Sequence, residues 1–266
     1  MDDYLQSVLA RLEQEYSFMA DAFDPPVMVT QGSASWFRYR KQSDSLLCFL
    51  KGVKLVSTLN AALVLLRHGY VQEVGALGRM ADDFFNEIMF FIQTADGPAP
   101  TRDHERFFTE FFQEEFEDPD DPLGSSKNRD NVPRRKIFAA FGQLAKEHLN
   151  PSDAQNTLTT IHRTFSGYVH GAYPHIMELF GNQPSRFHMT GMLGTTRISE
   201  WRQQFVIYLY RAIMASVFVS RKLGLQNVEQ NILALLVEFE TKLDIRPNET
   251  AEEIIRKVKK SRPTSY

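Results

Sequence analysis

The stretch Ile161-His162-Arg163-Thr164-Phe165-Ser166-Gly167-Tyr168-Val169-His170-Gly171 predicts the last turns of an α-helix that carries an arginine and a histidine on one face. Arg163 and His170 are seven residues apart, and at about 100° per residue they project in nearly the same direction. Ser166 and Gly167 lie between them. We therefore expect the two long side chains to contact one ligand.

The periodicity around this stretch predicts a helix over residues 152–172. Ser152-Asp153-Ala154-Gln155 reads as a capping box at its start, and Gly171 with Pro174 marks its end. His170 falls in the last turn, where the negative end of the helix dipole favours a protonated imidazole. Apolar residues at three- and four-residue spacing predict a core-facing seam on the opposite side: Leu158, Ile161, Phe165, Tyr168, Val169 and Ala172.

A second polar stripe is predicted upstream, in an α-hairpin with helices over 43–68 and 71–93. Asp82 and Asp83 follow Arg79 at the i+3 and i+4 positions, beside small residues that permit close approach. Two interpretations stay open. The stripe either resembles the Arg163/His170 stripe in function, or it is an intrahelical ion pair on a wet face, worth about 0.3–0.5 kcal/mol.

The composition predicts a globular, soluble protein. The 266 residues are 43% hydrophobic and include 21 Phe, mostly at helical spacing, which indicates core packing. A net charge of −3 gives no overall basic field for nonspecific nucleic-acid binding, so any RNA contact is expected to be local. The single Cys48 excludes an intrachain disulfide and is typical of a reducing compartment.

The expected location is the cytoplasm, with no membrane partner. The first residues are acidic and then amphipathic, which is not typical of a signal peptide. The apolar run 205–219 is shorter than a transmembrane span and contains Arg211.

The fold class predicted for the whole chain is an all-α helical bundle of about nine helices. We divide it into an N-terminal helix and loop (1–42), a helical core (43–178) and C-terminal helices packed on that core with a basic tail (179–266). No alternating strand pattern of useful length is found, and residues 36–41 read as a helix start whose aromatic and cationic side chains either stack on bases or are simply solvated. The other expected helices cover 3–23, 102–117, 134–149, 199–223, 226–243 and 249–260. Residues 117–131 are expected to form an acidic surface loop, and 174–196 an irregular segment. Whether Arg186, His188 and Arg197 cover the motif stays open.

The Arg163–His170 spacing resembles the R-x(4–6)-H signature of the HEPN superfamily, all-α proteins that include many metal-independent ribonucleases. The resemblance is strengthened by Leu65-Leu66-Arg67-His68-Gly69-Tyr70-Val71-Gln72-Glu73 and Leu77-Gly78-Arg79-Met80-Ala81-Asp82-Asp83, which look like a bacterial HEPN-like family of the DUF5677 type. It covers residues 45–175 loosely. One departure is that Asp82 and Asp83 stand where that family usually has a glutamate.

This resemblance implies a metal-independent endoribonuclease without a cofactor. His170 would move the proton of the ribose 2′-hydroxyl or of the leaving oxygen, and Arg163 would bind the scissile phosphate. Supporting roles fall to the polar residues around them: Arg79, Asp82, Asp83, Ser166 and Tyr168. The resemblance also implies RNA as substrate, a homodimer with one motif from each copy, and a toxin or antiphage defence effector held inactive by a partner protein or antitoxin.

The sequence gives little support for other kinds of catalytic chemistry. Glycine-rich phosphate loops and a G-x-S-x-G elbow are absent, and the spacing of His162, His170 and His175 does not suit a metal site. The alternative is a non-catalytic helical interaction or regulatory protein, in which the Arg/His face forms ion pairs with Asp82, Asp83 or Glu87. Burial separates the two: catalysis needs Arg163 and His170 open to ligands, whereas a scaffold encloses them.

Overall fold

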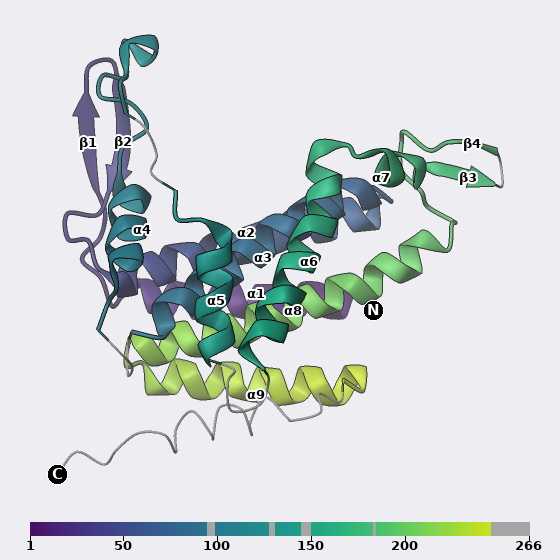
Figure 1. Ribbon diagram of the computed structural model, residues 1–266. Helices are drawn as coiled ribbons and strands as arrows, with labels where there is room; N and C mark the ends of the chain where they lie inside the picture. Colours follow the sequence, from purple (N-terminus) through teal and green to yellow (C-terminus); the bar gives the residue numbers. More distant parts are fainter. Residues whose placement is uncertain (95–98, 128–130, 145–149, 183–184, 246–266) are drawn as a thin grey trace.

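The computed structural model describes residues 1–94, 99–127, 131–144, 150–182 and 185–245 (Figure 1). Within these ranges the protein is all-α, as the sequence predicted, apart from one 3₁₀ turn and two short strand pairs. The helices are α1 Asp2–Ala20, α2 Asp44–Arg67, α3 Val71–Ile92, α4 Arg102–Phe112, α5 Arg134–Leu144, α6 Pro151–His170, α7 Tyr173–Met177, α8 Arg197–Lys222 and α9 Gln226–Leu243. The predicted helix at 249–260, the basic tail and residues 145–149 lie outside the described residues.

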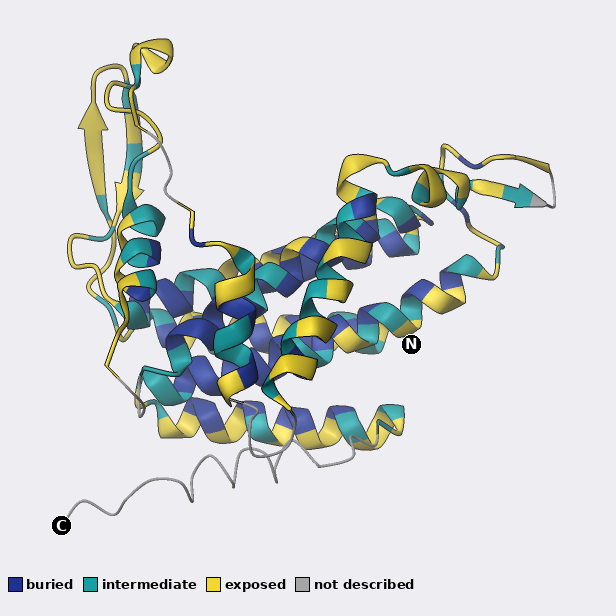
Figure 2. Ribbon diagram, in the orientation of Figure 1, coloured by how far each residue is buried: buried dark blue, intermediate teal, exposed yellow. Residues whose placement is uncertain are grey.

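The core lies between α2, α3 and α8, with α1 and α9 packed around them (Figure 2). Ser43 caps α2 by accepting a hydrogen bond from the backbone amide of Leu46 at 3.1 Å. Helix α2 is long and apolar enough to cross a membrane, with a mean hydropathy of 1.6, which the apolar run 205–219 is not. Half of its apolar window is buried inside the protein, and α1, α3 and α8 all pack on it. That burial is compatible with a soluble protein.

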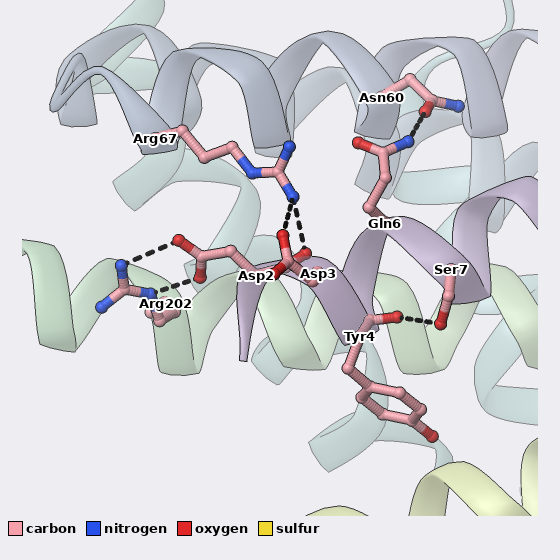
Figure 3. Close-up of polar contacts among 8 residues, drawn as sticks. All are labelled: Asp2, Asp3, Tyr4, Gln6, Ser7, Asn60, Arg67 and Arg202. Carbon is pink, nitrogen blue, oxygen red and sulfur yellow. Dashed lines mark hydrogen bonds and ion pairs between the residues drawn. The ribbon is translucent and has the colours of Figure 1, made fainter.

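Polar contacts tie the N-terminus to two core helices (Figure 3). Arg202 of α8 donates to both carboxylate oxygens of Asp2, at 2.7 and 3.0 Å. Arg67, in the last turn of α2, donates to the Asp2 carbonyl at 2.9 Å. A single hydrophobic cluster accordingly includes residues from all three predicted segments, among them Leu5, Leu59 and Phe205.

A β-hairpin occupies the region where a helix start was expected, so that prediction was wrong. Strands β1 (Val27–Gln31) and β2 (Ala34–Arg38) pair antiparallel around Gly32, whose φ of 57° suits the turn. The cross-strand pairs Met28↔Phe37 and Val29↔Trp36 place residues with strand preference opposite one another. Five-residue strands that are largely exposed leave too weak an alternation to detect in the sequence.

The loop after α4 supports this hairpin from one side (Figure 1). Helix α4 ends at Phe112 and not at 117 as predicted, because the chain turns away to contact the hairpin. The Ser33 amide donates to the Asp120 carboxylate at 3.0 Å, and Gln31 donates to the Glu117 carbonyl at 2.6 Å.

A second hairpin, β3 (Phe180–Asn182) with β4 (Ser185–Phe187), lies in the predicted irregular segment.

Candidate functional site on helix α6

Helix α6, which carries the Arg163/His170 motif, packs on α3 and α5 at the edge of the bundle. Its cap is Asn150, whose side chain accepts from the Ser152 amide at 2.9 Å, with Pro151 in the first turn. The predicted capping box at Ser152 is therefore displaced by two residues. The helix ends at Gly171, which adopts a left-handed conformation with φ of 62°. Ala154 and Gly167 are its buried residues, so one side of α6 faces solvent.

Arg163 and His170 both lie on the solvent side of α6. Neither side chain forms a hydrogen bond or an ion pair with any residue in the described parts of the chain. Their Cα atoms are about 10 Å apart along the axis, since each residue of an α-helix rises 1.5 Å. The predicted common direction of the two side chains agrees with this exposure, and both are accessible to a ligand.

The side of α6 that contacts α3 carries a different polar group, His162 with Ser166. Arg79 donates through Nε to the Ser166 hydroxyl at 3.3 Å and through Nη2 to His162 Nε2. Ser166 also donates to the His162 carbonyl at 2.7 Å. Ser166 was expected between Arg163 and His170, and the structure turns it toward the protein interior instead. Val169 was expected in the seam and is 51% exposed.

Burial lowers the pKa of His162, and the neighbouring Arg79 guanidinium lowers it further. The imidazole is therefore neutral at pH 7 and accepts the hydrogen bond from Arg79. This contact makes His162 a structural partner of the α3 stripe.

The α3 stripe itself is buried, so the wet-face interpretation was wrong. Arg79 pairs with Asp83, Asp83 with Arg134 of α5 at 3.3 Å, Arg134 with Glu87, and Glu87 with Lys51 of α2 at 2.6 Å. Arg79 is only 9% exposed and Glu87 3%. These alternating charges join α2, α3 and α5, and Arg79 and Asp83 reach α6 through His162 and Ser166, not through Arg163 or His170.

Asp82 points to a separate partner on α8. One carboxylate oxygen accepts from Arg211, and the other has no hydrogen-bond partner. Burial raises the pKa of Asp82, and the Arg211 charge opposes that rise. A cavity of about 10 Å³, large enough for one water, adjoins Asp82, Asn86 and Arg211. The geometry is that of a buried ion pair beside a water-sized cavity.

Tyr168 holds the short helix α7 against the end of α6. Its hydroxyl donates to Glu178 at 3.0 Å, and its ring packs edge-on against His175 at 4.3 Å. Burial raises the pKa of Tyr168, with Glu178 as the next cause. A glycine is required at position 167, because a Cβ there would lie 2.1 Å from the His175 imidazole. Tyr168 and Gly167 thus position α7 and do not lie on the exposed Arg163/His170 face.

Apolar side chains are exposed along the stretch of chain that contains and follows His170. The last turn of α6, α7 and the following hairpin contribute them, and they are Val169 at 51%, Tyr173 at 77%, Ile176 at 45%, Met177 at 37%, Phe180 at 41% and Phe187 at 44%. We call this set the α6–α7 apolar surface. Exposed aromatic and aliphatic groups that succeed one another along the chain are typical of protein-binding surfaces.

The three residues considered as a cover for the motif, Arg186, His188 and Arg197, lie elsewhere and have other contacts. His188 is buried, with a side chain that would collide with a Cβ on Gly181, and Arg197 pairs with Glu200 at 3.1 Å. Arg186 is exposed on β4. No contact joins any of the three to Arg163 or His170 within the described residues. Across the same residues, no group of three or more His, Cys, Asp or Glu is arranged to hold a metal ion.

Sequence reasoning missed the residues that connect helices in the interior: Arg134, Asn86 and the pairing role of Arg211. A signal existed for Arg211, because an arginine inside an apolar helical run needs a buried partner. No comparable signal marks Arg134, which reads as one of three consecutive cations.

Comparison of the chain with protein-family models, with curated proteins and with solved structures gave no match.

Proposed function

We propose that the protein is a metal-independent endoribonuclease of HEPN type and that Arg163 and His170 act on the RNA. One observation supports this best: both side chains project from the solvent side of α6, unpaired with any described residue, while the remaining polar groups of the region are enclosed in ion pairs. A scaffold interpretation of the motif requires the reverse. The resemblance to HEPN proteins is carried by the Arg163/His170 motif together with the stretches 65–73 and 77–83.

The proposed chemistry follows from the two side chains. The 2′-oxygen of the ribose forms a bond to phosphorus as the bond from phosphorus to the 5′-oxygen breaks, which leaves a 2′,3′-cyclic phosphate and a 5′-hydroxyl. His170 carries a proton from the attacking hydroxyl or to the leaving oxygen. Arg163 contacts the phosphate oxygens through a planar fork of donors and offsets the negative charge that develops there.

We propose that a second copy of the chain supplies the second proton-transfer group of this site. Transfer of one proton from the 2′-hydroxyl and another to the 5′-oxygen is served best by two groups, and each α6 offers one exposed histidine. The α6–α7 apolar surface lies next to His170 and gives a homodimer the apolar contact it needs. We further propose a cytoplasmic protein, acting as a toxin or antiphage effector, that a partner protein holds inactive.

The test is cleavage of end-labelled single-stranded RNA in EDTA. His170→Ala and Arg163→Ala are compared with His68→Ala and Arg135→Ala, which remove an exposed histidine at a helix end and an exposed arginine elsewhere. We expect cleavage by the wild type and by both controls, and a loss of at least about 100-fold in each motif variant. Equal cleavage by motif and control variants would rule out this site.

A non-catalytic binding protein is the second candidate, and the α6–α7 apolar surface favours it. In that case Tyr173→Asp would abolish association with a partner protein, and the His170→Ala protein would bind that partner as the wild type does. Under the ribonuclease proposal with a homodimer, Tyr173→Asp instead yields a monomer that has lost cleavage. Sedimentation and RNA cleavage measured on the same variant distinguish the two.

A further inference from the structure

The hairpin of β1 and β2 projects from the helical bundle beyond α4, beside the 113–127 loop (Figure 1). The two strands form a sheet of their own, so within the described residues no third strand pairs with either edge. Most of the hairpin is exposed (Figure 2). A two-stranded hairpin is only marginally stable in water, and a third strand adds stability. An unpaired strand edge is also a template on which an extended peptide can add.

The two faces of the hairpin differ in chemistry. Successive side chains of a strand point to opposite faces, so the pair Met28↔Phe37 lies on one face. Gln31 and Arg38 lie on the other. Met28 and Phe37 are 64% and 62% exposed, which makes the first face apolar and open to solvent. Gln31 and Arg38 both donate to the neighbouring loop, Arg38 to the Glu114 carboxylate at 2.5 and 2.7 Å. The loop therefore covers the second face.

The 113–127 loop concentrates the negative charge of the protein. It contains six carboxylates and one lysine, an excess of five that is larger than the net charge of −3 of the whole chain. Asp118 and Asp121 are exposed, and neither is paired with a cation among the described residues. Their carboxylates accept only from backbone amides of the loop, those of Asp120 at 2.9 Å and Gly124 at 3.1 Å. This side of the hairpin therefore attracts cationic side chains.

The free edge of β1 has no charged side chain to oppose a new strand, although proteins commonly protect such edges with charges. The two-residue turn makes Gln31↔Ala34 a hydrogen-bonded pair. Because pairs alternate along an antiparallel ladder, Thr30↔Ser35 is a non-hydrogen-bonded pair. The Thr30 amide and carbonyl accordingly point away from β2, where an added strand would meet them.

We propose that β1 binds an extended basic segment of a partner protein as a third strand. Alternating residues of that segment would place apolar side chains beside Met28 and Phe37, and lysines or arginines beside the 113–127 loop. A second copy of the chain fits less well, because its own β1 offers the loop no cation and its own loop adds further negative charge. The inference does not depend on RNA cleavage by α6.

Fluorescence anisotropy of labelled peptides with the full-length protein tests the proposal. The probe is KVKVKVK, in which lysine and valine alternate, and the control is KKVVVKK, which has the same composition and charge without the alternation. We expect saturable binding of the probe with a Kd below about 100 μM, and binding of the control that is at least about fivefold weaker. Equal affinity for the two peptides, or no binding of the probe at about 1 mM, overturns the proposal.

Substitution of Thr30 tests the edge of β1. Thr30→Pro removes the outward amide, and proline is tolerated in an edge strand where the N–H faces solvent. Thr30→Val keeps that amide, and both variants lose the 2.9 Å contact with the Ser35 hydroxyl. Thr30→Pro should weaken binding of the probe about fivefold, and Thr30→Val less than about twofold. Equal binding by the two variants overturns the strand addition.

A second variant tests the charge without touching the hairpin. Asp118→Asn combined with Asp121→Asn keeps both acceptor oxygens and removes two charges, so it should weaken the probe about threefold or more. Glu13→Gln, at an exposed position of α1, should leave binding within about 1.5-fold of the wild type. Equal effects of the two changes overturn the proposal. A dimer in sedimentation that Thr30→Pro abolishes and the probe displaces also overturns it, because the edge would then belong to a second copy.

Discussion

Arg211→Met tests the buried ion pair between α8 and α3. Asp82 is 5% exposed, one of its oxygens accepts from Arg211, and the other has no hydrogen-bond partner. Removing the arginine leaves a buried carboxylate without its counter-ion, a change that costs about 3–5 kcal/mol. For a chain of this size that corresponds to a fall in Tm of roughly 6–20 °C. Urea unfolding followed by circular dichroism at 222 nm measures the loss.

The matched control is Arg202→Met on the same helix. Arg202 is paired with Asp2, whose side chain is 24% exposed, so water compensates when the arginine is removed and about 1 kcal/mol or less is expected. A double variant, Arg211→Met with Asp82→Leu, should recover most of the stability because no buried charge remains.

The loss in Arg211→Met should also depend on pH. Burial raises the pKa of Asp82 in the folded protein, and losing Arg211 raises it further. Because the pKa of Asp82 is raised on folding, its contribution to folding stability is fully present below the unfolded pKa, near 3.8, and is lost as pH rises through the folded pKa. Arg211→Met should therefore be closer to the wild type at pH 5 than at pH 7. A loss below about 1 kcal/mol, equal at both pH values, would refute the reasoning.

Further predictions concern His162, Gly78 and Tyr168. The pKa of His162 is lowered in the folded protein, so its neutral form contributes to folding stability above the unfolded pKa, near 6.5, and that contribution is lost as pH falls through the folded pKa. In urea titrations, His162→Gln should therefore lose less stability than the wild type between pH 7 and pH 5. An equal loss in the two proteins would contradict this. Gly78→Ala places a Cβ 2.5 Å from the Tyr208 ring and should cost about 1–3 kcal/mol. Gly224→Ala, at a positive φ of 73° in open space, should cost about 1 kcal/mol, and a larger loss there than at Gly78 would argue against the packing. Tyr168→Phe should lower stability by about 1 kcal/mol through the lost Glu178 contact and leave RNA cleavage unchanged, since its hydroxyl faces α7.

Helical periodicity was sufficient to predict the long helices. Residues 226–243 were predicted as a helix and match α9 at both ends, and the hairpin of α2 and α3 was predicted within one residue. The apolar spacing in these segments repeats over many turns and is not overridden by tertiary contacts. The strands were missed because five exposed residues carry little pattern, and α4 was drawn too long because its end depends on contacts between the 113–127 loop and the hairpin.

The candidate site shows where spacing ceases to be informative. The seven-position separation of Arg163 and His170 fixed their common direction, and the predicted exposure of that face agrees with the structure. The same reasoning placed Ser166 on that face and Arg79 near it. The α3 stripe is buried because His162, Arg134 and Arg211 pair with it, and these residues lie about 50 to 130 residues further along the chain. No local sequence pattern indicates which polar face of a helix such distant partners will cover.

The most direct measurement is mass spectrometry of the 3′ ends that the protein leaves on single-stranded RNA in EDTA. We expect 2′,3′-cyclic phosphate ends from the wild-type protein, and their disappearance in both Arg163→Ala and His170→Ala while circular dichroism and melting temperature stay unchanged. Fragments with these ends at undiminished yield from both folded variants would contradict it.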